Sequence, residues 1–434
     1  MDTNIEYVLQ TARQRGVSFI RLWYGDVLGT MKAVAFPVSE LEKVIDDGVG
    51  FDGSALEAGT RRAEQDVIAR PDISTFMVLP WRKDSNVGRM FADIELPDGT
   101  PFDGDPRAQL KKVMAKAAGM GFRLQVGSEV EFYLFRELPE AGAPVPLEAG
   151  GYYELTPTDV ATDFRRNSIS FLESLGIPVR SSYHEGGPSQ HEIVLEHDDP
   201  VVHCDAILTT RMAMKQAAYN LGSYATFMPK PLEGEPGSAL HLHLSLFDEH
   251  DVNVFHDPDY PDRPLSTIGE RFMAGVLTHA AEFTAATSQW INSYTRLADG
   301  YEAPNAVNWS RRLSNPLVRV PGHRPGRAGS KRIEFRAPDA GCNPYLVTAL
   351  TLAAGLRGIE REYSLPPETT DMQPGGRLPH DLREATDKFE GSEFVREVLG
   401  DRLVEWFVDN KRRDWDAYSR HVTEFERRHT LPRL

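Results

Sequence analysis

The sequence has only two cysteines, Cys204 and Cys342, in 434 residues. Two isolated thiols are too few for a disulfide framework or a thiolate metal site, which indicates a reduced, cytoplasmic protein. The chain also lacks any run of about 18 apolar residues, the length needed to cross a bilayer. Its first residues contain no apolar signal core. We therefore expect neither export nor a membrane partner.

Basic residues are outnumbered, because 48 lysines and arginines stand against 64 aspartates and glutamates, a net charge of −16. This balance disfavours nucleic acid and anionic membranes as general partners and favours cations such as amines and metal ions. The apolar share of 41% and the charged share of 26% are those of an ordinary globular protein. A single core seldom exceeds about 300 residues, so two domains are expected.

A turn-rich segment between Pro101 and Pro106 is the predicted domain boundary. It divides the chain into a small mixed domain, residues 1–103, and a larger one, residues 104–434. In the first domain, the pattern predicts helices over 3–15 and 39–48, a hairpin around Gly25 to Gly29, a long loop over 50–72, and strands over 75–81 and 89–96.

The larger domain is predicted to alternate helices with strands, an α+β organisation in which helices pack behind strands that carry the chemistry. A helix over 106–121 leads into a strand with polar residues at alternate positions. Further helical patterns cover 157–175, 203–224, 266–290, 343–363 and 392–408, and the segment 366–379 is expected to be an exposed loop.

Polar residues occupy every second position of two apolar, strand-like segments. Glu129 and Glu131 lie in GSEVEFYLF, and His241 and His243 lie in SALHLHLSL. Residues two apart on a strand share a face, about 6.6 Å from each other. A buried carboxylate pair needs a positive partner, because like charges repel and have lost water. The alternatives are an exposed strand face for the glutamates and a satisfied core position for the histidines.

Two further carboxylates, Glu185 and Glu192, flank a Gly-Gly-Pro turn, and Glu334 alternates with Arg332 and Arg336 in KRIEFRAPD. Five glutamates with a histidine and no thiolate suit a hard cation, Mg²⁺ or Mn²⁺, better than zinc. Interleaved arginines suit a phosphate or carboxylate substrate, since the guanidinium fork matches both groups.

Three more residues are candidates on weaker grounds. Arg296 and Arg319 add positive charge to the proposed site, although a surface ion pair is the commoner role of a single arginine. Glu302 lies in a loop between Gly300 and Pro304, where it could act as a base or part of a lid, or simply be a solvated loop residue. Residue spacing alone therefore predicts metal-assisted phosphate chemistry and nothing more specific.

Several motifs follow one another in a fixed order: FDGS from Phe51, GSALHLHLS from Gly237, SYTRL from Ser293, GYEAP from Gly300 and RIEFRAPDAGCNPYL from Arg332. Together these motifs resemble the glutamine synthetase family over essentially the whole chain. The resemblance implies an N-terminal β-grasp domain and a C-terminal catalytic domain with an antiparallel sheet backed by helices. It also implies a homo-oligomer of two stacked hexameric rings, with sites shared between neighbouring subunits and Asp52 serving the adjacent one.

The resemblance further implies ATP as co-substrate, two or three Mg²⁺ or Mn²⁺ ions, and a role for each candidate residue. One metal would be held by Glu131, Glu185 and Glu192, and the other by Glu129, His241 and Glu334. Substrate binding is implied for Glu131, Gly237, Arg296, Glu302 and Arg336, and nucleotide binding for His243, Ser245, Arg319 and Arg332. Catalysis is implied for Asp52, Glu302, Arg319 and Arg336, with the two carboxylates attracting and deprotonating the amine that attacks γ-glutamyl phosphate.

Departures from the family pattern point to the amine. Ala55 replaces a serine of the ammonium pocket, and Pro236 and Ala239 replace Asn and Gly in the glutamate loop. These changes resemble the γ-glutamylpolyamine and γ-glutamylamide synthetase branch, so we expect a polyamine or another alkylamine as acceptor. Ammonia is the alternative. Ser314 stands where relatives have an arginine, which leaves open a weakly active sensor, and acidic clusters also occur in metal-dependent amidohydrolases. Tyr363 resembles an adenylylated tyrosine, with different surroundings.

Overall fold

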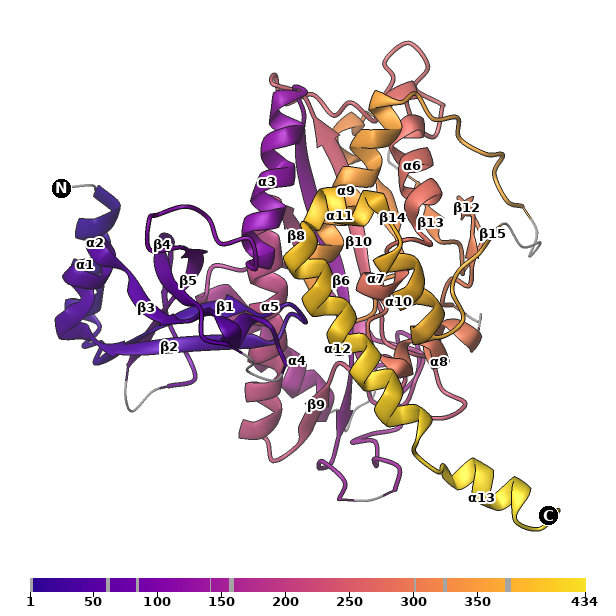
Figure 1. Ribbon diagram of the computed structural model, residues 1–434, viewed down its shortest axis with the longest axis horizontal. Coiled ribbons are helices and arrows are strands. Elements are labelled where there is room, and N and C mark those ends of the chain that lie inside the picture. Colours follow the sequence, from indigo (N-terminus) through magenta and orange to yellow (C-terminus); the bar gives the residue numbers. More distant parts are fainter. Residues whose placement is uncertain are drawn as a thin grey trace.

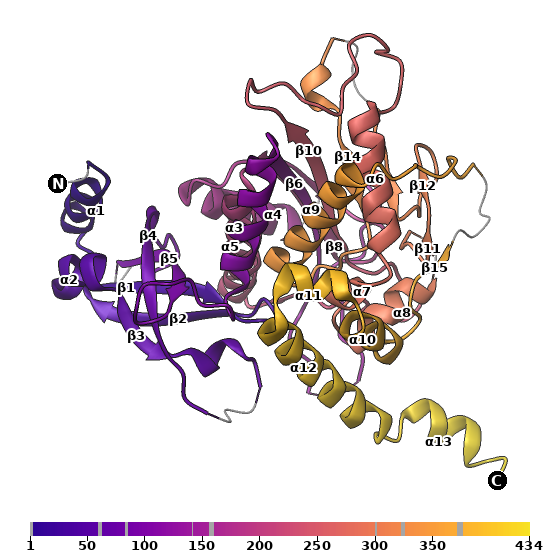
Figure 2. The same ribbon diagram turned by 45° about the horizontal axis from the view of Figure 1, so that its top comes forward.

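The computed structural model describes residues 3–59, 63–82, 86–140, 142–155, 160–299, 302–322, 326–370 and 376–434. In Figure 1 a small N-terminal sheet lies to one side of helices α3 and α5, and a larger sheet lies on the other side, backed by further helices. Figure 2 shows the same arrangement after a 45° turn, with the last helix, α13, extending away from the body in both views.

The N-terminal part contains a five-stranded sheet of order β2-β1-β5-β4-β3. The predicted hairpin is confirmed, because β1 and β2 pair antiparallel. The predicted loop over 50–72 is wrong in part, since β3 and the beginning of β4 lie within it and pair with each other. The elements are α1 (Thr3–Gln14), β1 (Phe19–Gly25), β2 (Met31–Pro37), α2 (Leu41–Asp47), β3 (Val49–Asp52), β4 (Asp66–Val78) and β5 (Val87–Glu95), with 3-10 turns at Val38–Glu40 and Gly53–Leu56.

The second part is organised around an eight-stranded, mainly antiparallel sheet whose main path is β12-β13-β14-β10-β6-β8-β7, with β9 paired to β6. Its central strands β6 and β10 carry the two alternating polar motifs. The strands are β6 (Arg123–Phe135), β7 (Val179–His184), β8 (Gln190–Asp198), β9 (Tyr224–Thr226), β10 (Leu240–Phe247), β12 (Trp309–Ser310), β13 (Val318–Arg319) and β14 (Ile333–Phe335); β11 (Ala306–Val307) and β15 (Gly376–Arg377) form a separate pair.

Helices cover this sheet, which confirms the predicted α+β class with an antiparallel catalytic sheet. Two predicted helices are interrupted. The pattern over 266–290 contains α6 and the short α7, and that over 392–408 breaks at Gly400, which has φ 79°. The helices are α3 (Pro106–Gly119), α4 (Val160–Ser174), α5 (Pro200–Asn220), α6 (Thr267–His279), α7 (Thr284–Thr287), α8 (Ile291–Asp299), α9 (Pro344–Glu360), α10 (Leu382–Glu390), α11 (Glu393–Leu399), α12 (Asp401–Ser419) and α13 (Glu424–Thr430), with a 3-10 turn at Ala328–Ser330.

A buried arginine ties the two parts together. Arg107, at the start of α3, places Nη2 2.7 Å from Asp72 Oδ2 on β4 and 3.0 Å from Asp205 Oδ2 on α5. Arg107 is only 3% exposed, so its charge depends on these carboxylates. The small sheet is thereby held against the helices that back the large one.

The thiols of Cys204 and Cys342 are free and buried. Within the described ranges, no helix is both long enough and apolar enough to cross a membrane.

Candidate active site

Strand register brings the alternating polar residues together. Glu129 on β6 pairs with His241 on β10, and Glu131 on β6 pairs with Glu192 on β8. Alternate side chains of a strand share a face, so these groups lie on one side of the sheet. The side chains of Glu129 and Glu131 are only 22% and 10% exposed. The alternative of an exposed strand face for these two glutamates is therefore wrong.

Glu131, Glu185 and Glu192 form the most acidic group of the site. All three are buried, and one donor oxygen of each lies within 4.8 Å of the others. Burial, reinforced by the charge of Glu131, raises the pKa of Glu185 to about 9. Burial together with Glu129 and Glu131 also raises the pKa of Glu192. A divalent cation among these oxygens would favour their ionised forms, and such oxygen donors suit Mg²⁺ or Mn²⁺. The donor set therefore fits a divalent metal.

A second group combines Glu129, Glu192 and His241, again with donor atoms within 4.8 Å. His241 Nδ1 lies 2.9 Å from Glu129 Oε2, and His243 Nε2 lies 2.8 Å from Glu129 Oε1. Burial works to raise the pKa of Glu129, but the bonds to the two histidines outweigh it and lower that pKa. Glu129 is thus kept ionised. Glu192 belongs to both donor groups.

Glu334, on β14, faces arginines. Arg319 Nη1 donates to Glu334 Oε2 at 2.9 Å, and Arg336 Nη1 donates to Oε1. Although burial opposes it, the charges of His241 and Arg336 lower the pKa of Glu334 to about 2. Its Oε1 lies 3.8 Å from His241 Nδ1. The structure therefore places Glu334 beside the expected second metal group, with both carboxylate oxygens bonded to guanidinium groups.

A cavity of 620 Å³ opens beside the carboxylates. Arg296, in its wall, is 3% exposed, and its Nη1 donates to Ala337 O at 2.9 Å. A Cβ atom on Gly237 would lie 2.6 Å from Pro229 O and 2.7 Å from Arg296 Cγ, so only glycine lets this loop pack on Arg296. The lining residues are Glu131, Tyr152, Gly186, Gly234, Glu235, Pro236, Gly237, Ala239, His241, Arg296, Glu302, Ala303 and Arg336.

A second cavity, of 450 Å³, is lined by three of the expected nucleotide-binding residues, His243, Ser245 and Arg332. Arg332 Nε donates to His243 Nδ1 at 3.1 Å, and Ser245 Oγ donates to Lys331 O at 2.8 Å. Arg180 and Arg327 also line this cavity, although the sequence patterns did not single them out. Three arginines around one cavity suit a phosphate-bearing ligand.

Comparison with known families assigns nearly the whole chain. Residues 16–97 match the model described as "Glutamine synthetase, beta-Grasp domain", and residues 103–430 match "Glutamine synthetase, catalytic domain". The chain belongs to the glutamine synthetase family. Members of this family ligate glutamate at the expense of ATP and use divalent metals, so the protein is an ATP-dependent ligase that forms a carbon–nitrogen bond.

Relatives of the glutamine synthetase family match along their whole length. The chain is 45% identical over 443 residues to a glutamine synthetase of Mycobacterium bovis, covering 99% of both chains. It is 42% identical to one of Methanosarcina mazei, covering 98% of this chain and 97% of the relative.

Among solved structures, a GmaS complex with ADP is similar, with a TM-score of 0.88 and 30% identity over 98% of this chain and 99% of the other. A Plasmodium falciparum glutamine synthetase shares the fold, with a TM-score of 0.88 at 22% identity over 99% of each chain.

One expected residue of the glutamine synthetase site, Asp52, stands apart from the carboxylates, whereas another, Glu302, lies at their cavity. Asp52 ends β3 in the N-terminal sheet, where its Oδ1 accepts from Ser54 N at 3.1 Å and Gln65 N at 3.0 Å. Asp52 is not among the lining residues of either cavity in the described part of the chain. Glu302 is exposed and lines the 620 Å³ cavity, whereas Gly300 and Tyr301 of the GYEAP motif lie outside the described residues.

The stretch around Ser314 offers one contact to the site, because Arg336 Nη2 donates to Ser314 O at 3.0 Å. Arg311, in the same stretch, places Nη2 2.7 Å from Glu368 Oε2.

Two tyrosines near the carboxylates were missed by the sequence patterns. Tyr152 lines the 620 Å³ cavity, and partial loss of water together with the charge of Glu185 raises its pKa to about 12. Tyr183, on β7, donates its hydroxyl hydrogen bond to Glu192. A signal was available in hindsight, since Tyr183 stands two residues before Glu185 and Tyr152 follows a Gly-Gly pair.

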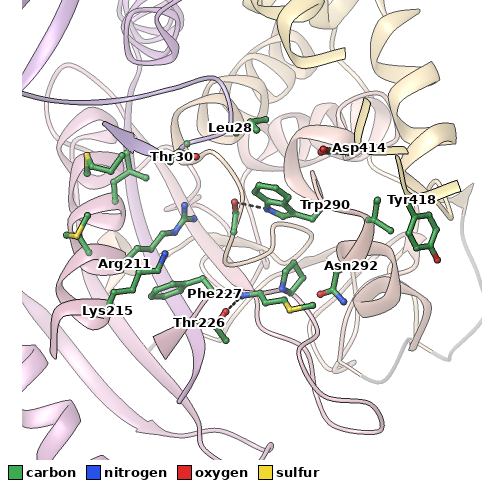
Figure 3. A pocket seen from close by; sticks show the side chains of 18 of the residues that line it. Leu28, Thr30, Arg211, Lys215, Thr226, Phe227, Trp290, Asn292, Asp414 and Tyr418 are labelled. Carbon is green, nitrogen blue, oxygen red and sulfur yellow. Dashed lines mark hydrogen bonds between the residues drawn. The ribbon is translucent and has the colours of Figure 1, made fainter. Parts of the chain in front are cut away.

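A larger cavity, of 880 Å³, is separate from the carboxylate cluster (Figure 3). Arg211 and Lys215 of α5 lie on one side of it, and Asp414 and Tyr418 of α12 lie on the other. It shares no lining residue with the 620 Å³ cavity. Although this cavity is larger, it lies apart from the carboxylates, so we do not place the chemistry there.

Proposed function

We propose that the protein joins the γ-carboxylate of L-glutamate to a polyamine or another alkylamine, through γ-glutamyl phosphate formed from ATP. One observation carries the proposal: the buried carboxylate cluster borders a cavity that also contains Arg296, Glu302 and Arg336. Such a cavity offers places for a carboxylate, a reacting acyl group and a cationic amine side by side.

The glutamate side of the cavity is assigned to Arg296 and the Gly237 loop. Arg296 is buried, and Nη2 donates to Arg336 O at 3.1 Å, so its guanidinium is fixed before any substrate arrives. A fixed fork matches the α-carboxylate of glutamate at little cost in side-chain entropy. Arg336 then faces the γ-carboxylate, where positive charge stabilises the transferring phosphoryl oxygens.

The metal-holding residues are proposed to be Glu131, Glu185 and Glu192 for one ion and Glu129, His241 and Glu334 for another. When bound, divalent cations would neutralise phosphate oxygens and the developing charge of the acyl phosphate. Glu334 would have to exchange an arginine contact for the ion, whereas Glu192 is already within reach of both groups. Nucleotide binding is assigned to His243, Ser245, Arg319 and Arg332.

The amine arrives as a cation, so it must first bind to carboxylates and then lose a proton to one of them. Carboxylates near the cavity mouth therefore determine which amine is accepted. Glu302 of the same subunit and Asp52 of a neighbouring one are proposed to bind the ammonium and remove a proton, since only the neutral amine is nucleophilic. Pro236 and Ala239 line the cavity where relatives have Asn and Gly, and Ala55 lies in the 3-10 turn beyond Asp52. These smaller or apolar side chains favour an alkyl-bearing acceptor.

Ammonia is the second candidate acceptor, because the 45% identical relatives are named glutamine synthetases. The structure of GmaS with ADP, at 30% identity, supports comparison with amine ligases as well. Phosphate release from ATP, measured with glutamate and each of ammonium, methylamine, putrescine and spermine, separates the two. We expect the highest kcat/KM with an alkylamine. Activity confined to ammonium would contradict the proposed acceptor, and absence of turnover with every amine would favour the weakly active sensor.

We further propose that the subunits form two stacked hexameric rings with shared sites, and that the β-grasp domain is residues 1–103 and the catalytic domain residues 104–434. The assembly is supported by the position of Asp52, which lies in the N-terminal sheet at the end of β3. A neighbouring subunit would have to bring its Asp52 to the cavity mouth.

A further inference from the structure

Tyr183 lies directly against the carboxylate that the two proposed metal groups share. Register pairs Tyr183 on β7 with Glu192 on β8, and the Tyr183 hydroxyl donates to Glu192 Oε1. Glu192 is 2% exposed and has donor-atom neighbours in both groups. A buried carboxylate surrounded by other carboxylates would otherwise be free to turn away from them, because like charges repel.

The ring of Tyr183 also contacts a second aromatic ring. It stacks on the ring of Tyr153, with centroids 4.3 Å apart and planes at 14°. Tyr153 N donates to His184 O at 3.0 Å, which ties the Tyr153 loop to the end of β7. Tyr153 has φ 58°, a left-handed backbone conformation that bulky residues rarely adopt. The ring of Tyr152 packs against that of Tyr153 in a T-shaped contact, with centroids 4.8 Å apart.

A hydrogen bond to a metal ligand from a side chain that is itself fixed sets both the orientation and the affinity of the ligand. We infer that Tyr183 is a positioning residue for divalent-metal binding: its hydroxyl holds Glu192 between the two groups of donor atoms, and its stack on Tyr153 fixes that hydroxyl. The inference rests on the metal-binding part of the proposed function and is independent of which amine is used.

The experiment is a titration of Mn²⁺ into the chelator-treated full-length protein, followed by the electron paramagnetic resonance signal of free Mn²⁺ in the absence of substrates. Tyr183→Phe keeps the ring and its stack but removes the hydroxyl. We expect it to weaken Mn²⁺ binding about 10-fold, the lower end of the usual effect of losing such a partner. Its melting temperature in chelator should match that of the wild type, which a merely structural role would not allow.

Two variants at the neighbouring position test the stack. Tyr153→Phe retains an aromatic ring at the same backbone angles and should bind Mn²⁺ like the wild type. Tyr153→Leu removes the ring face and should weaken binding in the same direction as Tyr183→Phe, because the hydroxyl loses its fixed position.

The outcomes separate this inference from the ligand set itself. Wild-type affinity in Tyr183→Phe would overturn the positioning role while leaving the metal ligands untouched. If Glu131→Gln also bound Mn²⁺ like the wild type, the proposed ligand set would be wrong instead. Weakened binding in Tyr183→Phe with an unchanged affinity in Tyr153→Leu would keep the hydroxyl bond and overturn the role of the stack.

Discussion

Glu131 connects the acidic donor group with the substrate cavity. It belongs to the acidic donor group, lines the substrate cavity, and accepts from Ala239 N at 2.8 Å. Glu131→Gln keeps the shape and the hydrogen bond but removes the charge that a cation needs. We expect kcat to fall by about 1,000-fold, roughly 4 kcal/mol of transition-state stabilisation.

The check is amine-dependent phosphate release, with Glu137→Gln as a matched control on the exposed segment after β6. The control should retain wild-type activity. A Glu131→Gln enzyme of normal activity would show that this carboxylate holds no catalytic metal.

Arg296 is expected to act on binding rather than on chemistry. Arg296→Lys retains a positive charge but loses the planar fork that its bonds to Ala337 O and Arg336 O hold in place. The KM for glutamate should rise about 10-fold with kcat reduced far less, since the lost contact exists in both ground and transition states. Steady-state kinetics with glutamate as the varied substrate measure this split. An equal loss of kcat would place Arg296 at the reacting carboxylate instead.

The acidic donor group predicts an unusual dependence of stability on pH. The folded-state pKa of Glu185 is raised to about 9 from an ordinary value of 4.5. Because the folded protein binds this proton more tightly than the unfolded chain, the contribution to stability is full at low pH and is lost as pH rises toward 9. A bound cation takes the place of the proton and should remove the loss.

Calorimetry between pH 5 and 9 tests this prediction. The melting temperature of the metal-free, chelator-treated protein should fall progressively as the pH rises, and that of the Mn²⁺-saturated protein should change less. Glu185→Gln should flatten the slope of the chelated protein. Equal slopes with and without Mn²⁺ would contradict a cation at this position.

At the scale of elements, the crossing of α6 and α9 depends on glycine. A Cβ atom on Gly275 would lie 2.1 Å from Ala354 O and 2.9 Å from Gly358 Cα. Gly275→Ala should therefore lower the free energy of unfolding by about 1 to 3 kcal/mol, the usual effect of overpacking. Gly119→Ala is the matched control, because a Cβ there meets nothing within 4 Å at the end of α3.

The control should be neutral or more stable by about 0.5 to 1 kcal/mol, as expected for alanine in a helix. Urea unfolding at one protein concentration measures both variants. Equal changes in the free energy of unfolding for Gly275→Ala and Gly119→Ala would mean that α6 and α9 can move apart at no cost in stability.

At the scale of the whole molecule, the shared site makes a prediction about mixed assemblies. Asp52→Asn and Glu302→Ala should each be nearly inactive alone. If Asp52 serves a neighbour, random mixed rings contain sites with both carboxylates intact, and activity should return to about a quarter of the wild-type value. Phosphate release from co-expressed, differently tagged subunits measures it. No recovery in verified mixed rings would place Asp52 in its own subunit's site or outside the chemistry.

Much of the local structure was predictable because it depends on neighbours in sequence. The hairpin of β1 and β2, the helix α9 and the alternating faces of β6 and β10 were predicted from turn residues and from apolar periodicity, and the structure confirms them. The breaks within helical segments were harder to predict from the sequence. Gly400, at φ 79°, ends one helix and begins the next, and periodicity alone does not register such a break.

The sequence by itself determined which residues could bind a hard cation, since alternation on a strand fixes which side chains share a face. Only the tertiary structure decided how those faces combine. Strand register placed Glu192 beside Glu131, from another part of the chain, and placed Glu334 beside Arg319. The physical reason is that strands are joined by backbone hydrogen bonds, which do not depend on which side chains are present. The packing of the whole domain therefore sets which residues face one another across a sheet, and local sequence pattern does not.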